Sequence, residues 1–229
     1  MNDTGARKTA AAEAAVAEVA SGTVLGLGSG STAARFLHAL AAATQAGTLH
    51  GVRGVATSRA TERLARELGI PLLDLPAEGV DVAVDGMDEV DADLNAVKGL
   101  GGALLREKVV AASATRFVLI GGEEKQVERL GGSVPLPVEV LAFGVARTAA
   151  RLRALGLDPR LRGGESEPFL TDNQQPVLDC GVPEHADVHA LARELDAIPG
   201  VLGHGLFLGM AEVAYLAGPD GVRALRRTA

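Results

Sequence analysis

Residues 23–32, TVLGLGSGST, join a short apolar run to a glycine-rich turn and two hydroxyl residues. The run at 23–27 predicts a buried strand, and the apolar spacing over 31–43 predicts the helix that follows it. Glycines let the backbone turn tightly beside a ligand, and the free amides of a helix N-terminus attract anions. The segment therefore predicts a phosphate-binding turn, with a plain strand-to-helix turn as the alternative.

Short apolar runs and helical patterns alternate through the first half of the chain. We expect helices at 8–20, 59–68 and 103–114, and strands at 52–56, 70–75, 80–84 and 117–120. Such alternation is typical of a parallel sheet with helices on both faces. The predicted fold class is α/β, with a Rossmann-like, mostly parallel sheet whose ligand site lies at the carboxyl ends of its strands.

The alternation changes after residue 132. Strands are expected at 138–141, 169–171, 177–180 and 201–207, and helices at 145–155 and 186–195. This order resembles a split β-α-β unit and predicts a smaller α+β, ferredoxin-like domain. Segments 212–216 and 221–226 return to the first sheet. We therefore expect a Rossmann-like catalytic domain of residues 1–133 and 208–229, and a small domain of residues 134–207.

Charge and cysteine content narrow the class of protein. The chain has 229 residues and a formal net charge of −7, and its lysines and arginines are scattered, which argues against nucleic acid or an anionic membrane as a partner. Cys180 is the single cysteine, which fits a reducing compartment. Asp3, Glu13 and Glu18 interrupt the N-terminal apolar residues, so we expect no signal peptide. No run is long enough to span a membrane, and we predict a cytoplasmic protein.

The glycine-rich turn also loosely matches a dinucleotide fingerprint, at Gly28, Gly30 and Ala33. A dinucleotide site expects a carboxylate about 20 residues further on, to hold the ribose. The next predicted strand ends at Thr57 and Ser58, with no carboxylate nearby. The turn therefore favours a phosphate over a whole dinucleotide.

A second candidate site, VDGMDE at 84–89, directly follows a predicted strand. Asp85 and Asp88 can hydrogen-bond sugar hydroxyls or transfer protons. Together with Asp91 and Asp93 they suggest a calcium loop, but the spacing of the acids and the glycine does not match the calcium pattern. We interpret Asp91 and Asp93 as a solvated acidic loop.

A third candidate, KGLGG at 98–102, precedes the predicted helix that contains Glu107. A lysine beside flexible glycines can bring its ammonium close to a developing oxyanion. On a helical wheel Leu105 and Val109 share one face, and Glu107 lies opposite. The pattern alone predicts Glu107 to be a surface residue.

Histidine and cysteine give no metal-site prediction. His185 and His189 have the spacing of a metal pair, but no third ligand is evident and the surrounding helix is polar. Cys180 lies in an alternating strand and is interpreted as a packed thiol.

In this order and spacing, the motifs resemble the ribose-5-phosphate isomerase A family. Further segments that carry the resemblance lie at 57–58, 106–108, 125–127, 135–140, 171–173, 198–201 and 218–222. The resemblance implies an aldose–ketose isomerase that interconverts D-ribose 5-phosphate and D-ribulose 5-phosphate through a cis-enediolate. It also implies that the enzyme needs neither a metal nor a cofactor, and that it forms a homodimer or homotetramer.

The resemblance further implies roles for individual residues. Glu107 would be the general base and Lys98 the stabiliser of the enediolate, with Asp85 and Asp88 serving ring opening and the sugar hydroxyls. The residues expected to bind substrate are Lys8, Ser29, Gly30, Ser31, Thr32, Asp85, Gly86, Met87, Asp88, Lys98, Gly99, Leu100, Gly101 and Lys125. Two of them depart from many relatives, which have glycine in place of Leu100 and alanine in place of Met87.

Two other classes of protein compete with this interpretation. Sugar-phosphate-sensing domains of transcription regulators share a related fold, but they would need a DNA-binding helix-turn-helix, and the helix before Gly22 is single and acidic. A nucleotide-dependent oxidoreductase is disfavoured by the missing ribose-binding carboxylate.

Overall fold

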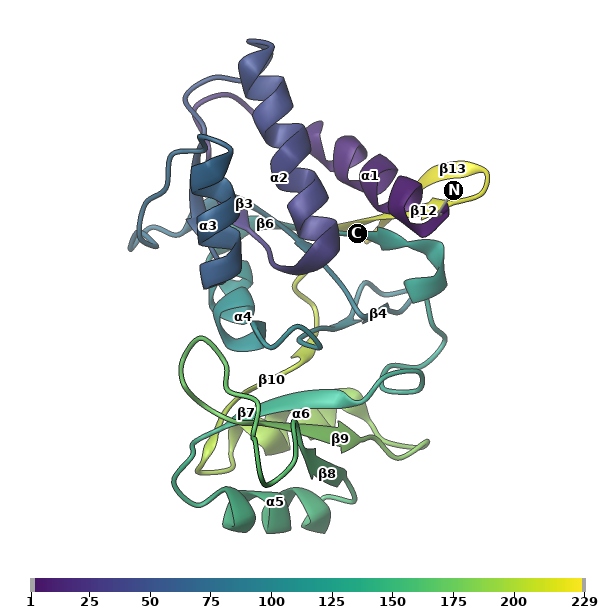
Figure 1. Ribbon diagram of the computed structural model, residues 1–229. Helices are drawn as coiled ribbons and strands as arrows, with labels where there is room; N and C mark the ends of the chain where they lie inside the picture. Colours follow the sequence, from purple (N-terminus) through teal and green to yellow (C-terminus); the bar gives the residue numbers. More distant parts are fainter. Residues whose placement is uncertain (1–2, 228–229) are drawn as a thin grey trace.

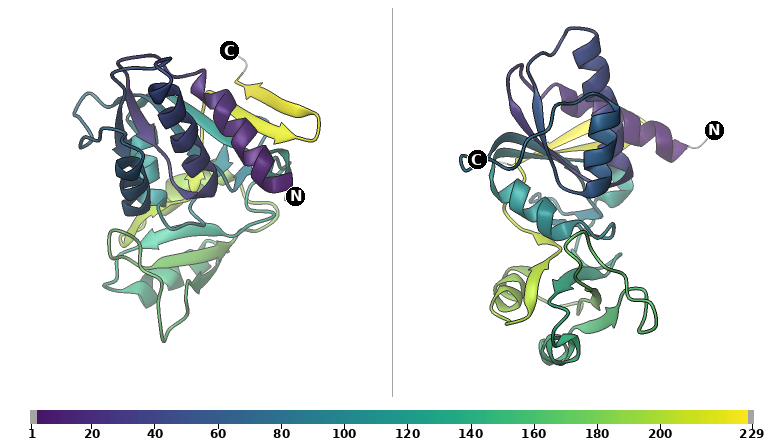
Figure 2. Two further views of the ribbon diagram at one scale, coloured as in Figure 1. Left: turned by 45° about the horizontal axis from the view of Figure 1, so that its top comes forward. Right: turned by 60° about the vertical axis from the view of Figure 1, so that its left-hand side comes forward.

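The computed structural model describes residues 3–227. Figure 1 shows a large sheet covered from above by helices of the N-terminal part of the chain, with a smaller sheet beneath it. Helix α4 (Leu104–Ala112) lies between the two sheets and contacts strands of both, an arrangement also visible in the rotated views of Figure 2. No helix within residues 3–227 is long and apolar enough to cross a membrane.

The large sheet has six strands in the order β13-β12-β6-β3-β1-β2. Its strands are β1 (Val24–Leu27), β2 (Arg53–Ala56), β3 (Val80–Gly86), β6 (Ala114–Gly122), β12 (Val213–Gly218) and β13 (Gly221–Arg226). All neighbours pair in parallel except β12 with β13. From β1 the chain first adds β2 on one side and later β3 on the other. The order therefore reverses beside β1, where an α/β sheet opens a crevice for its ligand.

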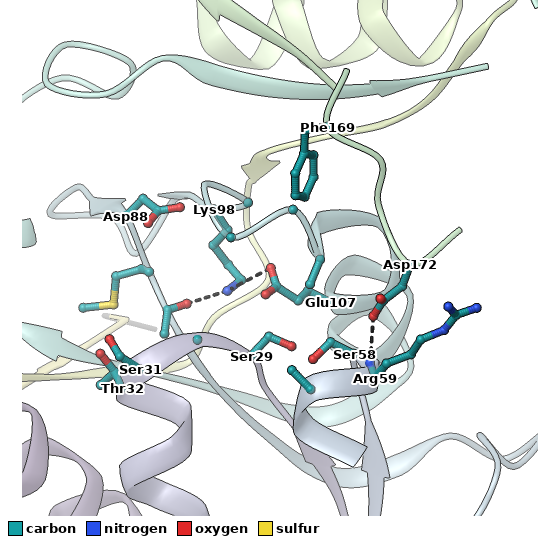
Figure 3. A pocket seen from close by; sticks show the side chains of 18 of the residues that line it. Ser29, Ser31, Thr32, Ser58, Arg59, Asp88, Lys98, Glu107, Phe169 and Asp172 are labelled. Atoms are coloured by element: carbon teal, nitrogen blue, oxygen red, sulfur yellow. Dashed lines mark hydrogen bonds and ion pairs between the residues drawn. The ribbon is translucent and has the colours of Figure 1, made fainter. Parts of the chain in front are cut away.

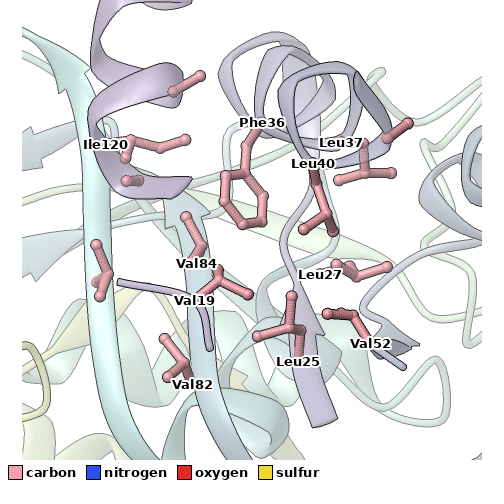
Figure 4. Packing of buried hydrophobic residues seen from close by; sticks show 14 of the residues in the cluster. Val19, Leu25, Leu27, Phe36, Leu37, Leu40, Val52, Val82, Val84 and Ile120 are labelled. Carbon is pink, nitrogen blue, oxygen red and sulfur yellow. The ribbon is translucent and has the colours of Figure 1, made fainter. Parts of the chain in front are cut away.

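Side chains alternate between the two faces of this sheet, and both faces are buried. Along β3, Val82 and Val84 belong to the core beneath α2, whereas Ala83 joins Val110 of α4 in the opposite core. Phe36 of α2 is fully buried in the first core (Figure 4). The helices on that face are α1 (Asp3–Val16), α2 (Gly30–Gln45) and α3 (Arg59–Glu67). Helices on both faces of a mostly parallel sheet confirm the predicted α/β class.

The smaller sheet is antiparallel throughout, in the order β10-β7-β9-β8. Its elements are β7 (Leu136–Val140), α5 (Val145–Ala154), β8 (Asp158–Leu161), β9 (Val177–Gly181), α6 (Val188–Asp196) and β10 (Val201–His204). This order and pairing give the ferredoxin-like arrangement that the sequence predicted. We retain residues 134–207 as a proposed domain.

A third, three-stranded sheet connects the other two, and the sequence did not predict it. It consists of β11 (Leu206–Phe207), β5 (Ala96–Val97) and β4 (Glu89–Val90), in that order. The strand expected at 201–207 is interrupted at Gly205, whose amide donates to Pro137 O and whose carbonyl accepts from the Lys98 amide. The chain thereby leaves β7 and pairs with β5 instead.

Two further expectations about strands are wrong. Residues 70–75 form only a single bridge, from Leu72 to Gly54, because Pro71 has no amide to donate to a ladder. Residues 169–171 form a loop with one bridge, from Leu170 to Pro176, and the strand that pairs with β9 is instead β8. The first helix ends at Val16 rather than at residue 20.

We predict that Phe36→Ala lowers the free energy of unfolding by about 3–5 kcal/mol, because it leaves a ring-sized cavity in a core that relaxes only in part. Phe143→Ala is the matched control, since that ring is 88% exposed, and it should change stability by no more than about 0.5 kcal/mol. Urea denaturation measures both. Equal losses for the two variants would contradict the packing described for α2.

Candidate active site

The glycine-rich turn after β1 packs directly against the end of β3. A Cβ atom at Gly28 would lie 2.6 Å from the Cα atom of Asp85, so only glycine fits there. Asp85 Oδ1 in turn accepts hydrogen bonds from the amides of Ser29, at 2.9 Å, and Gly86, at 2.7 Å. One carboxylate therefore fixes the turn to the neighbouring strand end.

Lys98 follows β5 and places its ammonium between two buried carboxylates (Figure 3). Its Nζ atom lies 3.0 Å from Asp85 Oδ2 and 3.3 Å from Glu107 Oε2. It also donates a hydrogen bond of 2.5 Å to the carbonyl of Gly86. The three charged side chains are each at most 6% exposed, so solvent screens their interaction only weakly.

Burial and mutual charge set the protonation of this cluster. Burial, reinforced by the Asp85 carboxylate, raises the pKa of Glu107 to about 8, although Lys98 acts in the opposite direction. Burial alone would lower the pKa of Lys98, but Asp85 and Glu107 raise it above its ordinary value. Lys98 therefore stays a cation over the pH range in which Glu107 titrates.

The expectation that Glu107 lies on the surface is wrong. Glu107 is 6% exposed, on the same side of α4 as the buried Leu104 and Ala111, whereas Val109 is 47% exposed. The wheel separated two faces of the helix but assigned the wrong one to the interior. The N-terminal turn of α4 faces a cavity lined by polar groups, so a carboxylate occupies the inner face.

The cavity has a volume of about 630 Å³, within the range of small-molecule sites. Thirteen of the residues expected to bind substrate or to catalyse line it: Lys8, Ser29, Gly30, Ser31, Thr32, Gly86, Met87, Asp88, Lys98, Gly99, Gly101, Glu107 and Lys125. The structure thus brings together residues from the turn after β1, the end of β3, the loop after β5, and α4.

Asp85 and Leu100 are the two expected residues that do not line the cavity. Asp85 lies behind Lys98 and reaches the cavity only through it. The Leu100 side chain is 38% exposed, and its amide donates to Asp88 Oδ2 at 3.0 Å. Leu100 therefore contacts Asp88 through its backbone amide.

One end of the cavity is cationic. Lys8 donates a hydrogen bond of 2.8 Å from Nζ to Ser31 Oγ, at the start of α2. Lys125 belongs to the short 3-10 helix η1 (Glu123–Lys125) and lines the same cavity. Lys8 thus stands at the amino end of a helix, an arrangement that attracts an anion, and Lys125 adds a second cation to the lining of the same cavity.

Several cavity residues were not predicted to bind substrate. They are Ser58, Arg59, Ala60, Arg63, Gly102, Ala103, Phe169, Leu170 and Asp172. Ser58 lies two residues after the end of β2, so the rule that ligand contacts lie at strand ends indicated this region. Phe169 and Asp172 come from the loop between β8 and β9 (Figure 3), and no local pattern indicates that this loop reaches the large sheet.

The remaining sequence candidates lie outside the cavity. Cys180 is buried, and burial raises the pKa of its thiol to about 12, as expected of a packed thiol. His185 and His189 are exposed. Asp93 is exposed as expected, but Asp91 is half-buried and organises the turn between β4 and β5 by accepting from the amides of Asp93 and Asn95.

Comparison with known proteins gives consistent matches over most of the chain. A family model described as ribose 5-phosphate isomerase A (phosphoriboisomerase A) matches residues 53–221. Proteins named ribose-5-phosphate isomerase A from Roseiflexus sp. (strain RS-1) and Deinococcus radiodurans are 55% and 45% identical, over 93% and 98% of this chain and 92% and 100% of their own.

Solved structures agree with these matches. The ribose 5-phosphate isomerase of Plasmodium falciparum has a TM-score of 0.93 at 35% identity, covering 98% of this chain and 100% of its own. A D-ribose-5-phosphate isomerase in complex with phospho-erythronic acid has a TM-score of 0.94 at 34% identity, covering 99% and 100%. The resemblance drawn from the motifs is confirmed, and the chain belongs to the ribose 5-phosphate isomerase A family.

Proposed function

We infer that the chain interconverts D-ribose 5-phosphate and D-ribulose 5-phosphate. The observation that carries this inference is the Lys98 ammonium, buried between Asp85 and Glu107 at the wall of the cavity. An aldose becomes a ketose when one proton moves from C2 to C1 and another moves from O2 to O1. A base and a fixed cation beside the sugar serve both transfers.

We propose Glu107 as the general base. Glu107 lines the cavity beside Lys98, whose Nζ atom lies 3.3 Å from Glu107 Oε2, and this position supports it as the group that takes the C2 proton of the open-chain sugar. A pKa of about 8 makes this carboxylate a stronger base than an ordinary glutamate, while part of it is ionised at neutral pH. The same carboxyl group can return the proton to C1.

We propose that Lys98 stabilises the cis-enediolate. Loss of the C2 proton places negative charge on the oxygens of C1 and C2, and a preorganised donor there is worth about 10²- to 10³-fold in rate. Asp85 holds the ammonium in place from behind. Asp88 lines the cavity beside Lys98, which supports a role in ring opening and in moving the proton between O2 and O1.

We propose that the cationic end of the cavity holds the 5-phosphate. The amino end of α2, with Ser31 and Thr32, offers amides and hydroxyls, and Lys8 and Lys125 offer charge. This end would keep the phosphate away from the reacting carbons at Glu107. The binding energy of the remote phosphate can then hold the open-chain sugar in position.

The resemblance also leads us to propose a cytoplasmic homodimer or homotetramer that works without metal or redox cofactor. Sedimentation equilibrium would determine the number of subunits.

Prolonged chelation followed by an activity assay would test whether the enzyme works without metal. Activity that returned only with an added divalent ion would contradict independence from metal.

Incubation of the purified protein with ribose 5-phosphate alone tests the proposed reaction. Ketose should form without any nucleotide or metal. A sugar-phosphate sensor would bind the sugar without converting it, and an oxidoreductase would require a nucleotide. Binding without turnover would therefore overturn the proposal.

We predict that Glu107→Gln lowers turnover by about 10²-fold or more, because glutamine keeps the shape of the side chain and removes its basicity. Glu194→Gln is the matched control, since Glu194 is exposed on α6, and it should retain wild-type turnover. Steady-state kinetics with ribose 5-phosphate measures both variants. Turnover above about a tenth of wild type in Glu107→Gln would exclude Glu107 as the base.

We predict that Glu107→Gln becomes more stable relative to wild type as the pH rises from 4.5 to about 8, with a constant difference above that range. Between the ordinary pKa of 4.5 and the folded pKa of about 8, native Glu107 keeps a proton that the unfolded chain has lost. Wild type therefore loses stability across this window, and glutamine does not. Urea denaturation at several pH values measures the difference, and a value independent of pH would show that the pKa of Glu107 is ordinary.

We predict that Lys125→Ala lowers kcat/KM for ribose 5-phosphate by about 10- to 150-fold, the loss expected from one charge-assisted hydrogen bond. Free ribose should be a very poor substrate, and the substitution should change its conversion little. The two sugars are compared on wild type and variant. Equal proportional losses on both sugars would move Lys125 from the phosphate site to a structural role.

A further inference from the structure

The loop 99–103 joins the two charged residues of the site, because it follows Lys98 and leads into α4, which carries Glu107. Gly99 and Gly102 have φ angles of 105° and 82°, and the Gly102 amide donates to the Gly99 carbonyl at 2.9 Å. The Leu100 amide donates to Asp88, which ties one side of the loop to the end of β3. The shape of this loop therefore helps to set how Lys98 and Glu107 face each other.

Arg162 holds the opposite side of the loop, although it comes from the smaller sheet. It directly follows β8, and its Nη1 atom donates to the carbonyls of Leu100, at 2.9 Å, and Gly99, at 3.2 Å. Arg162 itself does not line the cavity. The two carbonyl oxygens are thus engaged by a cation outside the cavity.

The guanidinium group is fixed in turn by its own neighbours. Asp179 on β9 accepts from Nε at 2.9 Å and from Nη2 at 2.5 Å, a bidentate geometry that sets the plane of the group. The Phe169 ring lies 5.4 Å from Cζ of Arg162 and covers Gly102, where any Cβ atom would collide with the ring. The Arg162 side chain is only 14% exposed.

We propose that Arg162 is a positioning residue for the isomerisation, which acts by holding the carbonyls of Gly99 and Leu100 and thereby the loop between Lys98 and Glu107. This inference rests on the proposed function. A carbonyl turned toward the enediolate would oppose its negative charge, whereas a carbonyl held by Arg162 is kept from doing so. A shift of about 1 Å in catalytic geometry can cost about 10²-fold in rate.

Other contacts between the two sheets do not depend on Arg162. Arg106 Nε donates to Asn173 Oδ1 at 2.8 Å, and the Arg59 amide donates to Asp172 Oδ2 at 2.7 Å. Loss of the Arg162 side chain therefore leaves the sheets joined. A folded but poorly active variant is the outcome that separates positioning from simple attachment.

The experiment compares Arg162→Ala and Arg162→Lys with Arg160→Ala. Arg160 lies on β8, two residues before Arg162. It is 80% exposed and pairs only with Asp158, at 2.9 Å, among the ion pairs of residues 3–227, so it is the matched control. Well below the melting temperature, Arg162→Ala should lower kcat by about 10- to 100-fold with a smaller change in KM. Lysine keeps the charge but not the planar fork, and it should recover only part of the loss.

Millimolar guanidinium should restore part of the turnover of Arg162→Ala, with sodium chloride at equal ionic strength as the control, because the free cation can occupy the vacated site. Wild-type kcat in Arg162→Ala, or a lower melting temperature with unchanged kcat, would overturn the proposal. Inactive wild-type protein would instead overturn the proposed function. A rise in KM alone would assign Arg162 to substrate binding.

Discussion

The buried ammonium of Lys98 is the feature on which the site depends. Taking a lysine out of water costs several kcal/mol, and only well-placed carboxylates offset that cost. The carboxylates of Asp85 and Glu107 each lie within 3.3 Å of Lys98 Nζ, and the Gly86 carbonyl accepts a hydrogen bond from the same atom. One cation is shared by two acids, and burial raises the pKa of both. Lys98 opposes that rise at each carboxylate, and at Asp85 the amides of Ser29 and Gly86 oppose it as well.

This cluster explains why three sheets meet at one point. Asp85 lies at the end of β3, in the large sheet, and Glu107 lies in the first turns of α4. Lys98 follows β5, which belongs to the three-stranded sheet. The two-residue strand β5 pairs with β11, which the chain reaches directly after β10. The ring centroid of Phe207, on β11, lies 5.4 Å from Lys98 Nζ, which is within cation–π distance. The smaller sheet is therefore attached to the large one through the walls of the site.

The sequence was informative where structure is local. The strand, turn and helix around Gly28 follow from glycine chemistry and apolar spacing. Gly86 and Asp88, which line the cavity, follow from the rule that ligand contacts lie at strand ends. The burial of Glu107 did not follow, because a helical wheel defines two faces without saying which one meets the cavity. No local sequence pattern predicts the contacts of Arg162 and Phe169 with the loop 99–103, because these contacts arise from the pairing of β8 with β9 and from packing between sheets. Such contacts are fixed by tertiary structure, and no residue next to them in the chain indicates their target.

Two pKa values are raised in the site, and the two shifts have different consequences because one approaches neutrality and the other moves away from it. Burial pushes the pKa of Glu107 up, toward neutrality, and the carboxylates push that of Lys98 up, away from it. The lysine is therefore a fixed charge, and the glutamate is the group that exchanges a proton at physiological pH. Had the lysine been buried without two acids, desolvation would have lowered its pKa, and it would compete with Glu107 for the proton. The Asp85 carboxylate thus helps to keep the proposed electrostatic stabiliser, Lys98, and the proposed base, Glu107, distinct although their charged groups lie 3.3 Å apart.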